Sequence, residues 1–115
     1  LVGLACLVMG EAQAQKFSFF DGEELHEALA DTMREIPQNQ FFSAIGVGYV
    51  LGVHDAMNGL PATWNPSLCF KSPESVSRGQ VIAIVRRFLE ERPSERPNSA
   101  ESLVVGALAR VWPCK

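Results

Sequence analysis

The sequence contains few of the residues on which catalysis and metal binding depend. Its 115 residues include two histidines and three cysteines. There is no Cys-x-x-Cys pair, and neither His26 nor His54 is followed by a second metal-type ligand three or four residues later, which excludes the usual zinc and thiol-redox motifs. A Gly-x-Ser-x-Gly nucleophile motif and a glycine-rich phosphate-binding loop are also missing. The sequence therefore predicts no catalytic residue, no metal and no cofactor.

Charged residues are also scarce. They make up 20% of the chain, with 10 Lys+Arg against 13 Asp+Glu and a net charge of −3. A nucleic-acid-binding protein needs a basic face to neutralise phosphates, so a nucleic-acid partner is not expected. The hydrophobic fraction of 47% is too high for a disordered chain, and the length leaves room for one core. These features indicate a single globular domain.

The first 14 residues have the pattern that ends a secretory signal peptide. Residues 1–10 carry no charge, and Ala12-Gln13-Ala14 supplies a small-x-small cleavage site. The apolar run is shorter than the roughly 20 residues of a transmembrane helix. We therefore predict a signal at 1–14, one domain over 15–115, a periplasmic location and no membrane span after cleavage. A buried N-terminal helix is the alternative.

The cysteines fit an exported protein. Cys6 would leave with the signal, and its lipidation is disfavoured because Gly3 stands where a lipoprotein signal carries Leu. Cys69 and Cys114 remain, both flank predicted helices, and an oxidising compartment favours joining them. Such a bridge would stabilise the fold by about 4 kcal/mol through loop entropy. We expect a structural cross-link.

Start and stop signals predict four helices, and hence an all-α bundle. Capping patterns open the first, third and fourth, and prolines or the final Trp-Pro-Cys end them. The expected boundaries are 21–37, 41–60, 77–93 and 98–112. The expected buried faces are Leu25, Ala28, Leu29, Met33 and Ile36; Phe42, Ile45, Tyr49, Val53, Met57 and Leu60; Val81, Ile84, Val85, Phe88 and Leu89; and Leu103, Val104, Ala107, Leu108 and Val111.

The second of these segments is the most apolar and has a rival interpretation. Its β-branched residues also suit a buried strand, but some twenty residues without a turn favour a helix. Gly48-x-x-x-Gly52 predicts close approach of a neighbouring helix, which would offset the helix cost of glycine. Asp55 follows His54 and should point about 100° away around the helix, so no catalytic pair is expected there.

Several motifs, taken in order, resemble a known family. They are Phe19-Phe20-Asp21-Gly22, then Gly48-Tyr49-x-x-Gly52-Val53-x-Asp55-Ala56, then the terminal Trp112-Pro113-Cys114. In this order and spacing the chain resembles the Rap/Tai-type immunity proteins of bacterial type VI secretion systems, over nearly all of residues 17–115. The resemblance implies a small, mostly helical periplasmic protein, often a homodimer. It also implies binding to a peptidoglycan amidase toxin, whose active-site groove the protein blocks without catalysis of its own.

The resemblance also assigns roles to residues. It matches Cys69–Cys114 to a family bridge and gives packing and capping roles to Gly48, Tyr49, Gly52 and Asp55. Many relatives carry a further cysteine pair, which this chain lacks: Gly46 stands at one of its positions and Leu29-Ala30 near the other. Two helices that relatives join covalently are therefore expected to pack here without a bridge.

Contacts with the partner are expected from an irregular connection rather than from the helices. Loops longer than about 12–15 residues are uncommon inside domains and often functional, and residues 59–73 form such a loop. Tryptophan and arginine are enriched at binding hot spots, so the expected contacts lie in this loop and in the elbow 92–97. The named candidates are Trp64, Asn65, Phe70, Arg92 and Arg96. Alternatively, Trp64 folds back over the bundle.

Two other functions remain as alternatives. The missing cysteine pair would also suit an envelope housekeeping or stress protein, such as a small chaperone without a cognate toxin. A small hydrolase would need His26 or His54 as its base, because no other side chain shuttles protons near neutral pH as readily.

Overall fold

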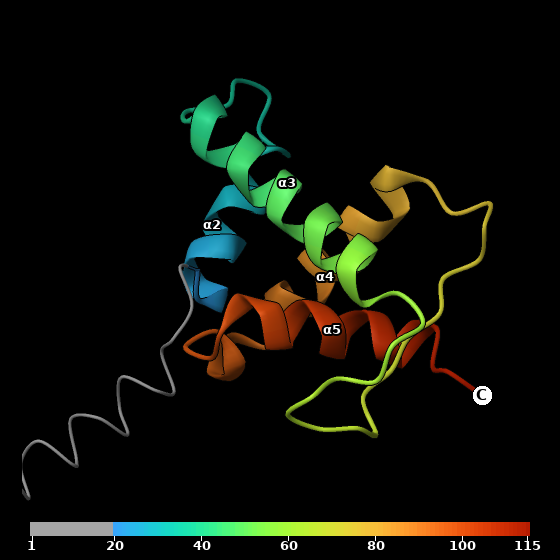
Figure 1. Cartoon of the computed structure of the whole chain (residues 1–115). Coiled ribbons are helices and arrows are strands. Elements are labelled where there is room, and N and C mark those ends of the chain that lie inside the picture. Colours follow the sequence, from blue (N-terminus) through green and yellow to red (C-terminus); the bar gives the residue numbers. More distant parts are fainter. Residues whose placement is uncertain (1–19) are drawn as a thin grey trace, which may run out of the picture.

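Four α-helices account for most of the structure, a computed structural model that describes residues 20–115 (Figure 1). They are α2 (Gly22–Asp31), α3 (Gln40–Met57), α4 (Arg78–Glu91) and α5 (Ala100–Val111), with a short 3-10 helix η1 (Pro93–Glu95) before α5. Over this range there is no strand, only two isolated bridges. The predicted all-α fold is confirmed, and the signal predicted at 1–14 lies outside the described residues.

The core lies where α3 crosses the other helices. In Figure 1, α3 runs across α2 and α4, and α5 passes beneath them; α3 contacts all three. None of the helices described is both long and apolar enough to cross a bilayer. The largest fully buried side chains are Phe70, Leu25, Leu29, Leu89, Leu108, Val50, Val81, Val85, Val104 and Val105.

The predicted capping boxes fix two helix starts. The Asp21 carboxylate accepts the Glu24 amide at 2.9 Å, and the Ser77 hydroxyl accepts the Gln80 amide at 3.1 Å. The cap predicted for the last helix is wrong by one residue. Ser99 caps α5, because the carbonyl of Asn98 instead accepts the amide of Gly22, at 2.9 Å.

The first helix ends six residues before Pro37, and two residues predicted on its buried face are exposed. Met33 is 64% and Ile36 80% exposed. The cause is Asp31, which lies at the end of α2 and accepts hydrogen bonds from the start of α3. Its carboxylate accepts the backbone amides of residues 38 and 39 at 2.8 and 3.1 Å and the Ser43 hydroxyl at 2.6 Å.

Asp31 is therefore a buried ionised group that joins two helices. The hydrogen bond from Ser43 lowers the pKa of this carboxyl most, followed by the bond from the Gln38 amide, while burial opposes them; Arg34, at 3.5 Å, lowers it further. Each of these donors favours the charged form.

The helix predicted over 41–60 is confirmed as α3, and four residues of its predicted buried face pack against the core: Phe42, Tyr49, Val53 and Met57. The prediction is wrong for Leu60, which follows the helix and is 55% exposed, and for Ile45. Ser43, Gly46 and Val50 face the core, while Ile45 is 41% exposed. A Cβ added at Gly46 would lie 2.6 Å from the Cβ of Ala28, so the close approach of a second helix occurs here. At Gly48 and Gly52, where it was expected, nothing lies within 4 Å.

The contribution of Asp31 predicts a pH dependence of stability. Its native pKa lies below the unfolded-state value of about 3.9. The stabilisation is therefore complete above that value and is lost as the pH falls through the lower native pKa. Asp31→Asn should lower the melting temperature at pH 7, and its deficit against the parent chain should shrink between about pH 5 and pH 2. Melts followed by circular dichroism test this; a deficit that stays constant with pH contradicts it.

Candidate functional site

The connection between α3 and α4 is the longest irregular segment of the described chain. It begins with Gly59, whose φ of +83° is a conformation that favours glycine. The Gly59 amide donates to the carbonyl of Phe70 at 2.7 Å, and the Ala62 amide donates to that of Leu68 at 2.9 Å. These bonds pair the two limbs of the loop and leave residues 63–67 as an exposed tip.

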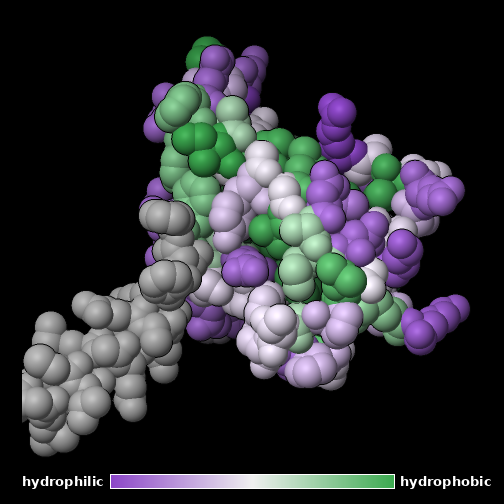
Figure 2. All heavy atoms as spheres, in the orientation of Figure 1, coloured by the Kyte–Doolittle hydropathy of each residue, from purple (hydrophilic) through white to green (hydrophobic). Residues whose placement is uncertain are grey.

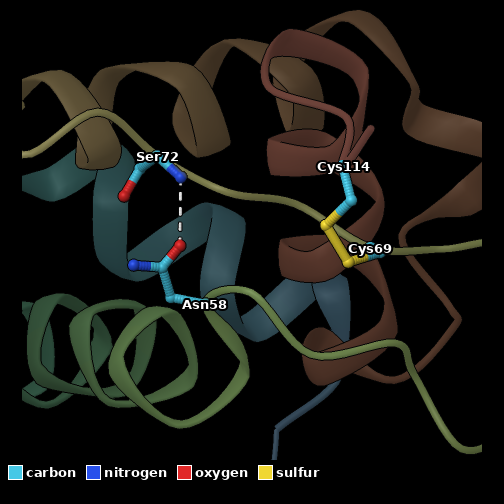
Figure 3. Close-up of a disulfide and its surroundings, with 4 residues drawn as sticks. All are labelled: Asn58, Cys69, Ser72 and Cys114. Atoms are coloured by element: carbon cyan, nitrogen blue, oxygen red, sulfur yellow. Dashed lines mark hydrogen bonds between the residues drawn. A yellow bond between two sulfur atoms is a disulfide. The ribbon is translucent and has the colours of Figure 1, made fainter.

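The returning limb is fixed to the end of the chain. Cys69 and Cys114 form a disulfide, with a Cα–Cα distance of 5.4 Å, which confirms the predicted bridge (Figure 3). The Cys114 amide donates to the Cys69 carbonyl at 3.1 Å, and the Lys71 amide donates to the Trp112 carbonyl at 2.9 Å. The returning limb of the loop is therefore joined to the segment after α5 by one covalent bond and two backbone hydrogen bonds.

A polar cluster ties the same limb to the end of α3. The Ser72 amide donates to the side chain of Asn58 at 3.0 Å (Figure 3), and the Ser72 hydroxyl lies 2.8 Å from Nε2 of His54. The other ring nitrogen of His54, Nδ1, lies 3.0 Å from Asp55. Because a carboxylate only accepts, Nδ1 carries a proton, and in the neutral ring Nε2 accepts the Ser72 proton.

The order Ser72–His54–Asp55 matches the connectivity of a hydrolase triad, so the expectation that His54 and Asp55 lie apart is wrong. The surroundings favour an anchor over catalysis. The Ser72 side chain is buried, its backbone amide already bonds Asn58, and the Asp55 side chain is 83% exposed. A nucleophile needs access for its substrate. Here the hydroxyl fastens the loop to α3.

The structure separates the residues predicted to contact a partner. Trp64 lies at the loop tip and is 45% exposed, and Asn65 is exposed beside it. The Asn65 side chain accepts the amide and hydroxyl of Ser67 at 3.2 and 2.6 Å, which shapes the tip. Phe70 is fully buried, with its ring centroid 5.6 Å from that of His54. Phe70 is therefore a core residue and is not retained as a contact.

The two arginines of the elbow have local roles. Arg96 donates to the Leu89 carbonyl at 2.8 Å and lies 3.6 Å from Glu23, so it links α4 to α2. The guanidinium of Arg92 lies 4.4 Å from the centroid of the Phe88 ring. The elbow precedes α5 and the loop packs at its end. Because α5 has 12 residues, the backbones of the two regions lie about 18 Å apart, although the Arg92 side chain reaches a groove that Arg110 and Val111 of α5 also line.

The four residues of the family motif lie on two different sides of α3; they are Gly48, Tyr49, Gly52 and Asp55. Tyr49 packs edge-on against Phe20, with ring centroids 5.2 Å apart. Gly48 and Gly52 lie on the exposed side.

Three residues that fix the loop and the helix junction were not predicted from the sequence: Asn58, Ser72 and Asp31. Asn58-Gly59 is a turn signal that could have indicated the first, whereas nothing in the sequence pattern marks the other two. Between residues 20 and 115 no group of three or more His, Cys, Asp or Glu side chains could bind a metal ion.

A family model describing Rap1a immunity proteins matches residues 21–114. The chain belongs to this family. The match contains all four helices, the loop and both cysteines, so the resemblance seen in the sequence motifs is confirmed. Comparison with curated protein sequences gives no match. Membership of the Rap1a immunity proteins implies a toxin as the binding partner.

Proposed function

We propose that this Rap1a protein neutralises a peptidoglycan amidase toxin of a type VI secretion system in the periplasm. The proposal is that it binds over the active-site groove of the toxin and contributes no catalytic group. Family membership supports the immunity role. The disulfide supports an oxidising compartment, where such bonds form and persist.

The observation that carries the proposal is an exposed tryptophan on a fixed loop. Limb pairing, the disulfide and the bonds to α3 restrain the segment on both sides of Trp64 before any partner binds. Restraint of this kind reduces the entropy lost on association. Tryptophan is among the residues most enriched at binding hot spots. A half-exposed aromatic side chain at a loop tip can enter a groove on a partner.

The first experiment identifies the partner and then tests the tip. Tagged residues 15–115, exported to the periplasm of the source bacterium, should recover a cell-wall amidase, and the protein should inhibit it. Trp64→Ala should weaken binding by about 2 kcal/mol or more, roughly 30-fold, without changing helicity. The control is Ile36→Ala, which truncates an apolar side chain in the turn after α2 that is even more exposed than Trp64, 80% against 45%, and which should bind like the parent protein.

Two results would contradict the proposal. Equal affinities of the Trp64→Ala and parent proteins would remove the loop tip from the interface. Recovery of a mixed set of envelope proteins without an amidase would favour the housekeeping or chaperone-like role instead.

We also propose that two copies pair through the outer face of α3. This helix carries no Lys, Arg, Asp or Glu before Asp55. Phe41 and Ile45 are exposed on it, and Gly48 and Gly52 leave room for a second helix. Figure 2 shows hydrophobic atoms gathered over the N-terminal part of α3. An exposed apolar patch of this kind typically marks an interaction surface.

The pairing predicts a change of mass in solution. Light scattering after size-exclusion chromatography should give a dimer for the parent chain and a monomer for Ile45→Glu, because the new carboxylate would be buried unpaired. Val111→Glu, at a similarly exposed position on α5, should remain dimeric. A monomeric parent chain, or a dimeric Ile45→Glu variant, rules out this interface.

A further inference from the structure

A small groove lies between α4 and α5, apart from the loop tip that we propose as the toxin contact. Its apolar floor is formed by Ile84 and Phe88 of α4 and by Ala107 of α5, Val111 lines its edge, and its volume is about 130 Å³. An apolar cavity of roughly 150 Å³ is known to accept a benzene ring. The groove therefore has room for one aliphatic side chain. Val111, predicted on the buried face of α5, is 48% exposed at its edge.

Two arginines without partners line this groove from opposite helices. Arg87 projects from α4 and Arg110 from α5, and neither makes an ion pair or side-chain hydrogen bond with any residue from 20 to 115. Their neighbour Arg86 differs, because it pairs with Glu90 at 3.1 Å. The two free guanidinium groups are thus available to an external anion.

The two other charged side chains that line the groove, Glu91 and Arg92, carry opposite charges. Glu91 is the single carboxylate that lines it, and the guanidinium of Arg92 lies 3.7 Å from Glu91. Arg92 also pairs with Glu95 at 3.4 Å. With Glu95 included, three arginines face two carboxylates, so the groove keeps a net positive charge in a protein whose net charge is −3, and Arg87 and Arg110 are its cations that no described residue pairs.

We infer that this groove binds an acidic peptide segment of a protein partner. An aliphatic side chain of the segment enters the apolar floor, and carboxylates on either side of it pair with Arg87 and Arg110. Arginine pairs with carboxylates through two parallel hydrogen bonds, which gives geometric selectivity as well as charge. Both features of the groove are used only by a ligand that carries anionic and apolar groups together.

Other anionic ligands use less of this site. A nucleic acid would need a broad basic face, and two free cations do not form one. A free phosphate would pair with the arginines but leave the apolar floor exposed. The segment after α5 also links the groove to the loop, because Val111 precedes Trp112, whose carbonyl accepts the Lys71 amide. A single partner could therefore occupy both surfaces.

The test uses synthetic peptides and the intact chain, so it does not depend on finding the toxin. An octapeptide with blocked, uncharged termini and a Leu between two Glu residues is titrated into isotopically labelled protein. Chemical-shift changes of the protein's backbone amides are followed by NMR. Shifts should be confined to α4 and α5 around the groove. The double variant Arg87→Ala/Arg110→Ala should bind at least tenfold more weakly. Arg78→Ala, which removes another unpaired arginine near the start of α4, should bind like the parent chain.

Each remaining outcome overturns the inference in a distinct way. Equal weakening by Arg78→Ala would show general charge attraction. Equal binding of a peptide with Ser in place of Leu, or saturation by inorganic phosphate alone at similar concentration, would show an anion site without the apolar component. Because both arginines are exposed and unpaired, the double variant should melt like the parent chain, and a matched melt excludes misfolding as the cause of weaker binding.

Discussion

The covalent link between Cys69 and Cys114 is the constraint on which the arrangement of the site depends. The cysteines are 45 residues apart in sequence, and the bridge joins the returning limb of the loop to the segment after α5. A closed loop of this length stabilises the folded chain by about 4 kcal/mol, a large share of the 5–15 kcal/mol typical of a domain. The same bond positions the loop, because the backbone bonds around it align residues 69–71 with 112–114.

Hydrogen bonds restrain two junctions that the single disulfide does not cross, one between the loop and α3 and one between α2 and α3. His54, Asn58 and Ser72 attach the loop to α3, and the Asp31 carboxylate joins the end of α2 to the start of α3. The positions at which the family resemblance places a second cysteine pair, Gly46 and near Leu29-Ala30, lie on these same two helices. Gly46 packs directly against Ala28, so close contact and a buried, hydrogen-bonded carboxylate hold α2 and α3 together. A buried charge that is fully hydrogen-bonded can specify such a junction, since leaving it unpaired is costly.

Much of the fold could be predicted from local sequence signals, whereas the remaining features depend on tertiary contacts. Capping boxes at Asp21 and Ser77 were predictable because their partners lie three residues away. The exposure of Met33 and Ile36 was not, because α2 ends where Asp31 meets residues up to twelve positions later. Phe70 was predicted as a contact because it lies in a loop, yet pairing with Pro113 places it in the core. The disulfide was predictable from cysteine number, while the anchor at Ser72 depends on a contact 18 residues away in sequence.

The disulfide fixes the conformation of the loop before a partner binds, and amide hydrogen exchange with and without reductant tests this directly. After reduction, verified by alkylation of both cysteines, the bonded amides of Gly59, Ala62 and Lys71 should exchange at least about tenfold faster, while the interior of α4 keeps its protection. Unchanged protection of the loop amides in the reduced protein would contradict the account.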